Sequence, residues 1–191
     1  TDLVRLEGFP AEERGLAKIP NKKLDIIQNP FSKDVDDVIL LPALNPDVSI
    51  IHAQYVGTDG AVRIKGLTFA DLEQAKASKH VIVTCEEILP RNVIRQDPDQ
   101  NSLPPFFIDA VVHAPYAAHP TACHYFYDYD PSHLRLYQKA AQDDEAFHSY
   151  LKEWVYDVAD QSIYLEKIGI NDLLRIKADP CLGYARGLDR R

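Results

Sequence analysis

The chain has 191 residues, a net charge of −8, 46 % hydrophobic residues and 26 % charged residues. These values are typical of one globular domain, and the negative charge argues against non-specific binding to nucleic acid or to an anionic membrane. No apolar run approaches the ~20 residues of a membrane span, the charged start has no signal-peptide pattern, and the three cysteines are too widely spaced for a disulfide framework. We therefore predict a cytoplasmic protein.

The first part of the chain is interrupted by glycines and prolines. Residues 1–37 contain them too closely spaced for a long helix or strand, which predicts an extended lead-in arm. We place the domain boundary after this arm and predict one α/β domain over residues 38–191.

Short apolar runs rich in valine and isoleucine follow the arm. Unbroken runs of this kind predict strands that are buried on both faces, as in a parallel sheet. A helix predicted over 68–79, with Thr68 as its N-cap, connects two of the runs. Asp59-Gly60 predicts a small hairpin over 55–66. The predicted strands cover 37–44, 47–54, 80–88 and 106–115.

After Pro131 the pattern becomes helical, with predicted caps at Ser132, at Asp143 or Asp144, and at Asn171. The sequence thus predicts an α/β fold, an open mostly parallel sheet with helices on both faces and a helical C-terminal cap from about residue 132. Four strands are few for such a sheet, so we expect a partner sheet or further sequence to complete it. The predicted helices cover 132–142, 144–160, 161–169 and 171–179.

One stretch, residues 107–131, gathers His113, His119, Cys123 and His124, all of which are common metal ligands. Closed zinc sites pair their ligands at short, repeated spacings, and here no second pair follows. Two prolines also prevent the side chains from sharing a helical face. We predict that no metal binds here and interpret His113 and His119 as pocket-lining or hydrogen-bonding groups.

Polar side chains end two of the predicted strands. His52 and Gln54 close the run 47–54, and Glu86 and Glu87 lie near the end of 80–88. In open α/β sheets the ligand binds outside the carboxyl ends of the strands. Because adjacent strand residues point to opposite faces, only one of the two glutamates faces such a crevice. A core histidine, a loop glutamine and a helix-capping glutamate are the plain alternatives.

Five residues are therefore candidate substrate-binding groups. Phosphate-binding and nucleophile-elbow motifs (GxGxxG, GxxxxGK[ST] and GxSxG) are missing from the sequence. The aromatic string YFYDYD at 125–130 is typical of a rim at a cleft or interface. The candidates are His52, Gln54, Glu86, His113 and His119.

Taken in order, these segments resemble the A (alpha) subunit of glutaconate CoA-transferase and its relatives among the class I CoA-transferases. The resemblance covers about residues 20 to 170, and it implies an open α/β fold and CoA transfer between carboxylic acids through a glutamyl-CoA thioester. It is carried by NPFS at 29–32, LPALNPDVSIIHAQ at 41–54, DLEQAKASKHVIVTCEEI at 71–88, IRQDP at 94–98 and FFIDAVVHAPYAAHPTACHYFYDYD at 106–130.

The resemblance also implies partners and roles. It implies a heteromer whose B (beta) subunit carries the reactive glutamate, with coenzyme A as a substrate, no tightly bound cofactor and no catalytic residue on this chain. Family members of the alpha type have a glycine-rich stretch before the matching region, so we expect this chain alone to be inert. The loop at 107–131 is expected to form the wall and rim of the acyl-CoA pocket. The alternatives are a subunit of an acyl-CoA ring-opening hydrolase of the same family and a non-catalytic assembly subunit.

Overall fold

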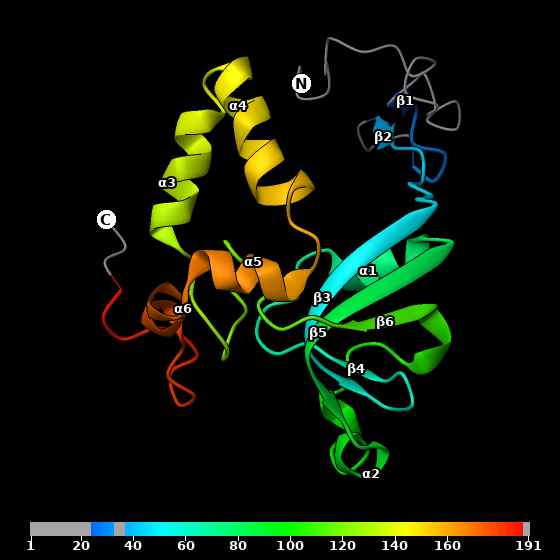
Figure 1. The fold of residues 1–191 in the computed structure, drawn as a ribbon. Coiled ribbons are helices and arrows are strands. Elements are labelled where there is room, and N and C mark those ends of the chain that lie inside the picture. Colours follow the sequence, from blue (N-terminus) through cyan, green and yellow to red (C-terminus); the bar gives the residue numbers. More distant parts are fainter. Residues whose placement is uncertain (1–23, 33–36, 189–191) are drawn as a thin grey trace. The chain divides into compact units, whose positions relative to one another are not determined.

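The structure is a computed structural model that describes residues 24–32 and 37–188 (Figure 1). The chain divides into two compact units, residues 1–46 and 47–191. Most of the predicted lead-in arm lies outside the described residues, so its boundary stays a prediction.

The first unit contains a separate two-stranded sheet. Strand β1 (Asp25–Ile27) pairs antiparallel with β2 (Val38–Leu40). The predicted place of residues 37–44 in the parallel sheet is therefore wrong. Pro42 and Pro46 follow β2 and lack the amide hydrogen that an internal strand must donate, so β2 ends before the main sheet begins.

The second unit contains a four-stranded sheet in the order β4–β3–β5–β6, in which β3, β5 and β6 run parallel. Strand β4 pairs antiparallel with β3, and this confirms the hairpin predicted at Asp59-Gly60. Gly60 has a φ of 86°, a conformation that glycine adopts without steric cost. The α/β fold with a mostly parallel sheet is thus confirmed. The strands are β3 (Val48–Gly57), β4 (Val62–Arg63), β5 (His80–Leu89) and β6 (Ala110–His113).

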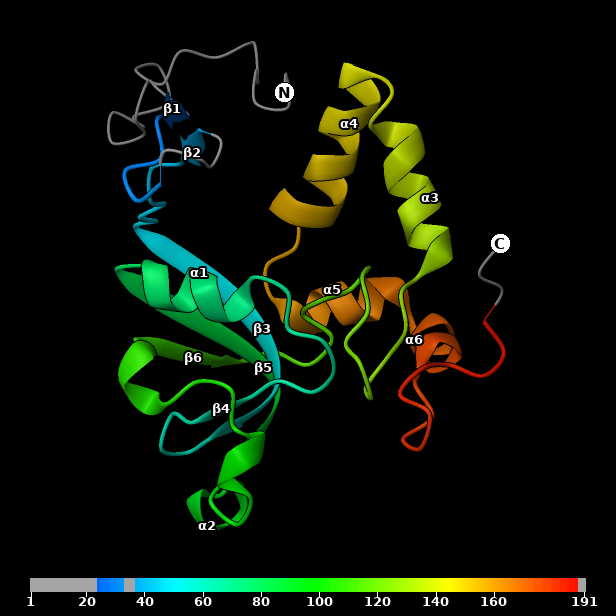
Figure 2. The same cartoon turned by 180° about the vertical axis from the view of Figure 1, so that it is seen from behind.

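Helix α1 (Asp71–Ala77) covers one face of this sheet (Figure 2). Its Ala75 belongs to the same buried cluster as Ile51, Val83 and Cys85, and none of these side chains is more than 2 % exposed. The removal of this apolar surface from water is the main force that holds α1 on the sheet.

The opposite face of the sheet carries apolar side chains that the described residues leave exposed. Ile50 is 69 % exposed and Val48 is 51 % exposed, although the intervening Ser49 and the following Ile51 are buried. Alternation along β3 places the exposed and buried side chains on opposite faces. The continuous apolar runs therefore reflect a sheet with two apolar faces, and α1 covers one of them.

Four further helices follow the sheet. In both views α3 and α4 lie side by side, and α5 lies between this pair and the sheet (Figures 1 and 2). Helix α4 continues into a π-helical turn, Lys152–Tyr156. Within the described residues, no helix combines the length and apolarity needed to cross a bilayer. The helices are α3 (Pro131–Ala140), α4 (Asp144–Leu151), α5 (Gln161–Ile168) and α6 (Ile170–Ile176), with the short α2 (Arg91–Ile94) after β5.

Asp143 caps α4 as predicted, but three other predicted caps are wrong. Asp130 caps α3 in place of Ser132, because an aspartate before a proline at the first helical position can accept from the next two amides. Gly169 stands at the start of α6 in place of Asn171, and Thr68 precedes α1 without capping it.

Candidate functional site

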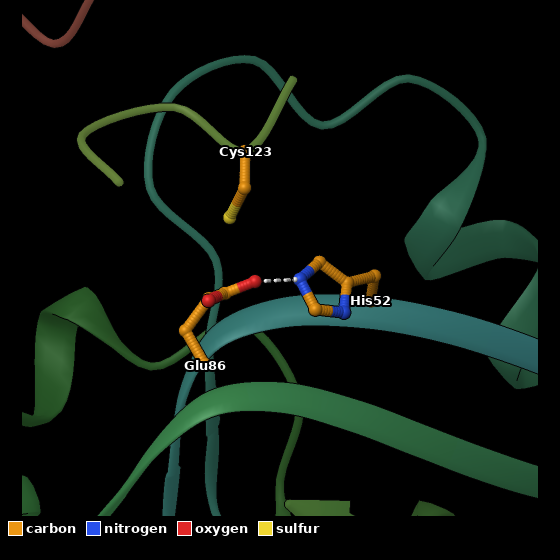
Figure 3. Close-up of side chains that lie close together, drawn as sticks. All are labelled: His52, Glu86 and Cys123. Atoms are coloured by element: carbon orange, nitrogen blue, oxygen red, sulfur yellow. Dashed lines mark hydrogen bonds and ion pairs between the residues drawn. The ribbon is translucent and has the colours of Figure 1, made fainter. Parts of the chain in front are cut away.

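His52 and Glu86 meet on neighbouring strands (Figure 3), but they do not end these strands as predicted, because β3 continues to Gly57 and β5 to Leu89. The parallel register sets His52 beside Thr84, and Glu86 lies two residues further along the same face. Nε2 of His52 lies 2.8 Å from Oε1 of Glu86, and Nδ1 lies 2.8 Å from Oγ1 of Thr84. Contacts at both ring nitrogens fix the orientation of the imidazole.

The carboxyl group of Glu86 is buried, with 3 % of the residue exposed, and it accepts several hydrogen bonds. The amide of Tyr116 donates to both oxygens, at 3.1 and 2.9 Å, and the hydroxyl of Tyr127 donates to Oε1 at 2.8 Å. Tyr116 has a φ of 61°, a strained value for a bulky residue, which indicates that the surrounding loop holds this amide toward the carboxylate. Glu87, the next residue, is exposed on the other face, as alternation requires.

The thiol of Cys123 lies above the Glu86 carboxylate (Figure 3). One potential ligand atom from each of His52, Glu86 and Cys123 lies within 4.8 Å of the other two. Burial, together with the charge of Glu86, raises the pKa of the Cys123 thiol, so the thiolate that a metal requires is disfavoured. Both nitrogens of His52 and both oxygens of Glu86 already have protein partners. The absence of a bound metal stays a prediction.

A cavity of about 640 Å³ opens beside these side chains. His52, Gln54 and Cys123 lie in its wall, together with residues 64–67 on one side and 121–124 on the other. This is the size range of small-molecule sites. Side chains of β3 and part of the histidine-rich loop thus come together around one cavity, which is our candidate site.

Gln54 connects the two loops that border this cavity. It is 5 % exposed, its Oε1 accepts from the amide of Lys65 at 2.9 Å, and its Nε2 donates to the carbonyls of Lys65 and His124, both at 3.1 Å. These bonds occupy the amide group of Gln54. The geometry therefore gives Gln54 a positioning role, and its contact with substrate stays a prediction.

The other two candidates lie outside the cavity wall. His113 is exposed on β6, and its Nε2 lies 3.1 Å from the carbonyl oxygen of Glu86. His119 is buried among the C-terminal helices, with Nδ1 2.8 Å from the Tyr164 hydroxyl and Nε2 3.3 Å from Oδ2 of Asp130. Burial lowers the pKa of His119, although Asp130 opposes this effect. The structure thus brings His52, Gln54 and Glu86 together and leaves His113 and His119 apart from the cavity.

The interpretation of 125–130 as a rim is wrong for Tyr127, which is 1 % exposed. Its hydroxyl accepts from the amide of Ala118 at 3.0 Å and donates to Glu86. Burial and the charge of Glu86 raise the pKa of Tyr127, so the phenol keeps its proton as a donor. Alternation of tyrosines with aspartates gave no signal for this burial, because Glu86 lies 41 residues earlier in the chain. Tyr125, by contrast, is 39 % exposed.

The three cysteines are expected to differ in their reactivity. Cys181 is exposed, whereas Cys85 and Cys123 are buried. Burial raises the pKa of Cys85 to about 11 and also raises that of Cys123. Iodoacetamide at about pH 8 should therefore modify Cys181 alone in the folded protein. Peptide mass spectrometry checks this, with a denatured sample as the control, and alkylation of native Cys123 as fast as Cys181 would contradict it.

Comparison with known proteins shows which family the chain resembles. The pattern of the family described as Coenzyme A transferase matches residues 32–114. The chain is 46 % identical over 169 residues to the A-type subunit of glutaconate CoA-transferase from Acidaminococcus fermentans, a match that covers 88 % of this chain and 52 % of that protein. It is 30 % identical over 148 residues to the A-type subunit of 3-oxoadipate CoA-transferase from Pseudomonas knackmussii, covering 78 % of this chain and 51 % of that protein.

The fold agrees with these matches. The crystal structure of glutaconate coenzyme A-transferase from Acidaminococcus fermentans superimposes with a TM-score of 0.84 and 45 % identity, covering 90 % of this chain and 54 % of that chain. The chain therefore spans about half the length of the relatives that it matches. Because the family pattern, the sequence identity and the fold agree over the matched region, the chain belongs to the coenzyme A transferase family.

Proposed function

We propose that this chain forms one wall of the acyl-CoA crevice in a CoA-transferase that moves CoA between carboxylic acids. The observation that carries the proposal is the cavity lined by His52 and Gln54 of β3, with Glu86 of β5 bonded to His52, in a chain of this family. Two relatives are named as A-type subunits, which supports a partner of the complementary B (beta) type. The domain boundary at residue 38 and the cytoplasmic location remain part of the proposal.

In the proposed reaction, a glutamate carboxylate on the B-type partner attacks the thioester carbonyl of the donor acyl-CoA. The C–S bond breaks, and an acyl-glutamyl anhydride and CoA thiolate form. The thiolate then attacks the glutamyl carbonyl, which releases the donor carboxylate and leaves a glutamyl-CoA thioester. The acceptor carboxylate reverses these two steps and leaves as a new acyl-CoA. CoA is thus a substrate, and no tightly bound cofactor is needed.

The attacking carboxylate is not assigned to Glu86. Both oxygens of Glu86 accept hydrogen bonds, and burial leaves 3 % of the residue exposed. Such bonds stabilise the carboxylate and weaken it as a nucleophile. Glu86 instead holds His52 at the cavity, where the imidazole is placed to contact the acyl group.

The proposal is tested with this chain coexpressed with its B-type partner. We expect CoA transfer from the assembled enzyme and none from either polypeptide by itself. Incubation with acyl-CoA followed by hydroxylamine should convert a glutamate of the partner into a hydroxamate, which peptide mass spectrometry locates. A hydroxamate at Glu86 or Glu87, or transfer by this chain alone, would overturn the assignment.

The same preparation separates the alternatives. A ring-opening hydrolase would release new carbon fragments from a cyclic acyl-CoA when no acceptor carboxylate is present. A non-catalytic assembly protein would leave turnover unchanged when His52 is replaced by alanine. For a transferase we expect neither result.

A further inference from the structure

Lys65 lies at the boundary between two cavities of the second unit. It lines the candidate cavity of about 640 Å³ and also a second cavity of about 520 Å³, which borders Tyr55, Gln100 and Tyr125. Among the described residues in the two walls, Lys65 is the one lysine or arginine. A ligand that extends from one cavity into the other must therefore pass this side chain.

The backbone of Lys65 is held firmly. The buried Gln54 bonds to both its amide and its carbonyl, at 2.9 and 3.1 Å. The next residue, Gly66, has a φ of 95°, and a Cβ atom there would come within 2.9 Å of the His124 ring. A larger residue would therefore strain or displace the loop. The loop that carries Lys65 is fixed before any ligand arrives, which reduces the entropy lost on binding.

Aromatic rings orient the ammonium of Lys65, and among the described residues no acid neutralises it. Its Nζ lies 5.4 Å from the ring centroid of Tyr55 and 5.5 Å from that of Tyr125. Ring faces attract a cation but leave its N–H donors available. Within the described part of the chain no carboxylate forms an ion pair with Lys65. Among the described residues that line the two cavities, Asp71 is the one acidic residue. Its Oδ2 accepts a hydrogen bond from the amide of Phe69 at 3.2 Å.

We propose that Lys65 is the recognition residue for an anionic oxygen group of the bound substrate, with Gln54 as its positioning residue. The proposal rests on the proposed function. Two parts of the substrates carry such a group, the distal carboxylate of a dicarboxylic acid and a phosphate of CoA. In a chain of net charge −8, an anion needs a local cation of this kind.

The experiment compares the assembled wild-type enzyme with Lys65→Met, Lys65→Arg and, as a matched control, Lys76→Met. Lys76 is exposed on α1 and lies outside both cavity walls. The acceptor probes are glutarate and pentanoate, which have equal chain length and differ by one carboxylate. The CoA probes are CoA and dephospho-CoA. The Michaelis constant and kcat are measured for the two acceptor acids, and the calorimetric dissociation constant is measured for every probe.

If Lys65 binds the distal carboxylate, Lys65→Met should raise KM and Kd for glutarate about 10- to 100-fold, the value of one charge-assisted hydrogen bond. Values for pentanoate and both CoA forms should not change. If Lys65 binds the 3′-phosphate of CoA, the same loss should appear for CoA and be absent for dephospho-CoA, and if it binds the pyrophosphate, the loss should appear for both. In each case Lys65→Arg should retain most of the affinity and Lys76→Met all of it.

Equal constants for wild type and Lys65→Met with every probe would overturn the proposal. A wild-type assembly that binds the probes without transferring CoA would refute the proposed function. The dissociation constants of the Lys65 variants would then still test whether Lys65 binds the anionic group. The two failures are therefore distinguishable.

Discussion

Replacement of Glu86 by alanine is expected to lower the free energy of unfolding by about 3 kcal/mol, the effect of leaving several buried donors without an acceptor. The donors are the His52 ring, the Tyr116 amide and the Tyr127 hydroxyl, of which the last two lie 2.9 and 2.8 Å from the carboxylate. His52 would also lose its orientation at the cavity. We expect CoA transfer by the assembled enzyme to fall about 100-fold, because a small misplacement of a substrate-contacting group is costly.

Glu87→Ala is the matched control, since it removes the same side chain from the neighbouring exposed position. Urea unfolding should show a change within about 0.5 kcal/mol for this variant. The free energy of unfolding of Glu86→Gln should lie between those of Glu86→Ala and Glu87→Ala. The amide keeps the volume and one acceptor of the carboxylate but turns an NH₂ group toward existing donors. Equal stability of Glu86→Ala and Glu87→Ala would contradict the network described for Glu86.

Asp130→Ala is expected to cost about 2–3 kcal/mol of stability, the sum of a lost helix N-cap and a lost buried hydrogen bond. Asp130 is 4 % exposed, and its Oδ1 accepts from the amides of Ser132 and His133 at 2.8 and 3.2 Å. Its Oδ2 lies 3.3 Å from Nε2 of His119, and Arg175 is nearby. One carboxylate thus connects α3 to the loop of His119 and to α6.

The cost of Asp130→Ala should depend on pH. Burial by itself would raise the pKa of Asp130, but the amides of His133 and Ser132 and the His119 ring outweigh it and hold the pKa below its ordinary value. A carboxyl whose pKa is lower in the folded state adds stability above its unfolded pKa of about 3.9 and loses that contribution as pH falls through the folded pKa. The difference in the free energy of unfolding between wild type and Asp130→Ala should therefore be largest at neutral pH and should shrink below about pH 4.

Asp160→Ala controls for capping alone. Asp160 is an exposed cap whose Oδ1 accepts from the amide of Ile163 at 3.0 Å. We expect this variant to lose about 1 kcal/mol. Chemical denaturation at a series of pH values measures both variants. A cost for Asp130→Ala that equals that of Asp160→Ala at neutral pH would contradict the buried network.

The local predictions succeeded where a pattern of a few residues carries the information. Asp59-Gly60 produced the expected hairpin, and Asp143 capped the expected helix. The errors arose where two neighbouring signals competed. Ser132 was the predicted cap of α3, but the structure uses Asp130, two residues earlier. Residues 37–44 were predicted to form a strand of the main sheet, but the prolines that follow separate β2 from that sheet.

The sequence by itself determined the α/β class, the chain order of the main-sheet strands and the C-terminal helices, and the resemblance to CoA-transferases. Periodicity, turn residues and motifs are short-range properties, so they can be read along the chain. Only the tertiary structure decided that Glu86 is buried with Tyr127, and that Gln54 is bonded to the carbonyl of His124, 70 residues away. Such contacts depend on how distant segments pack, and a buried polar group selects whichever partner that packing brings within hydrogen-bond distance.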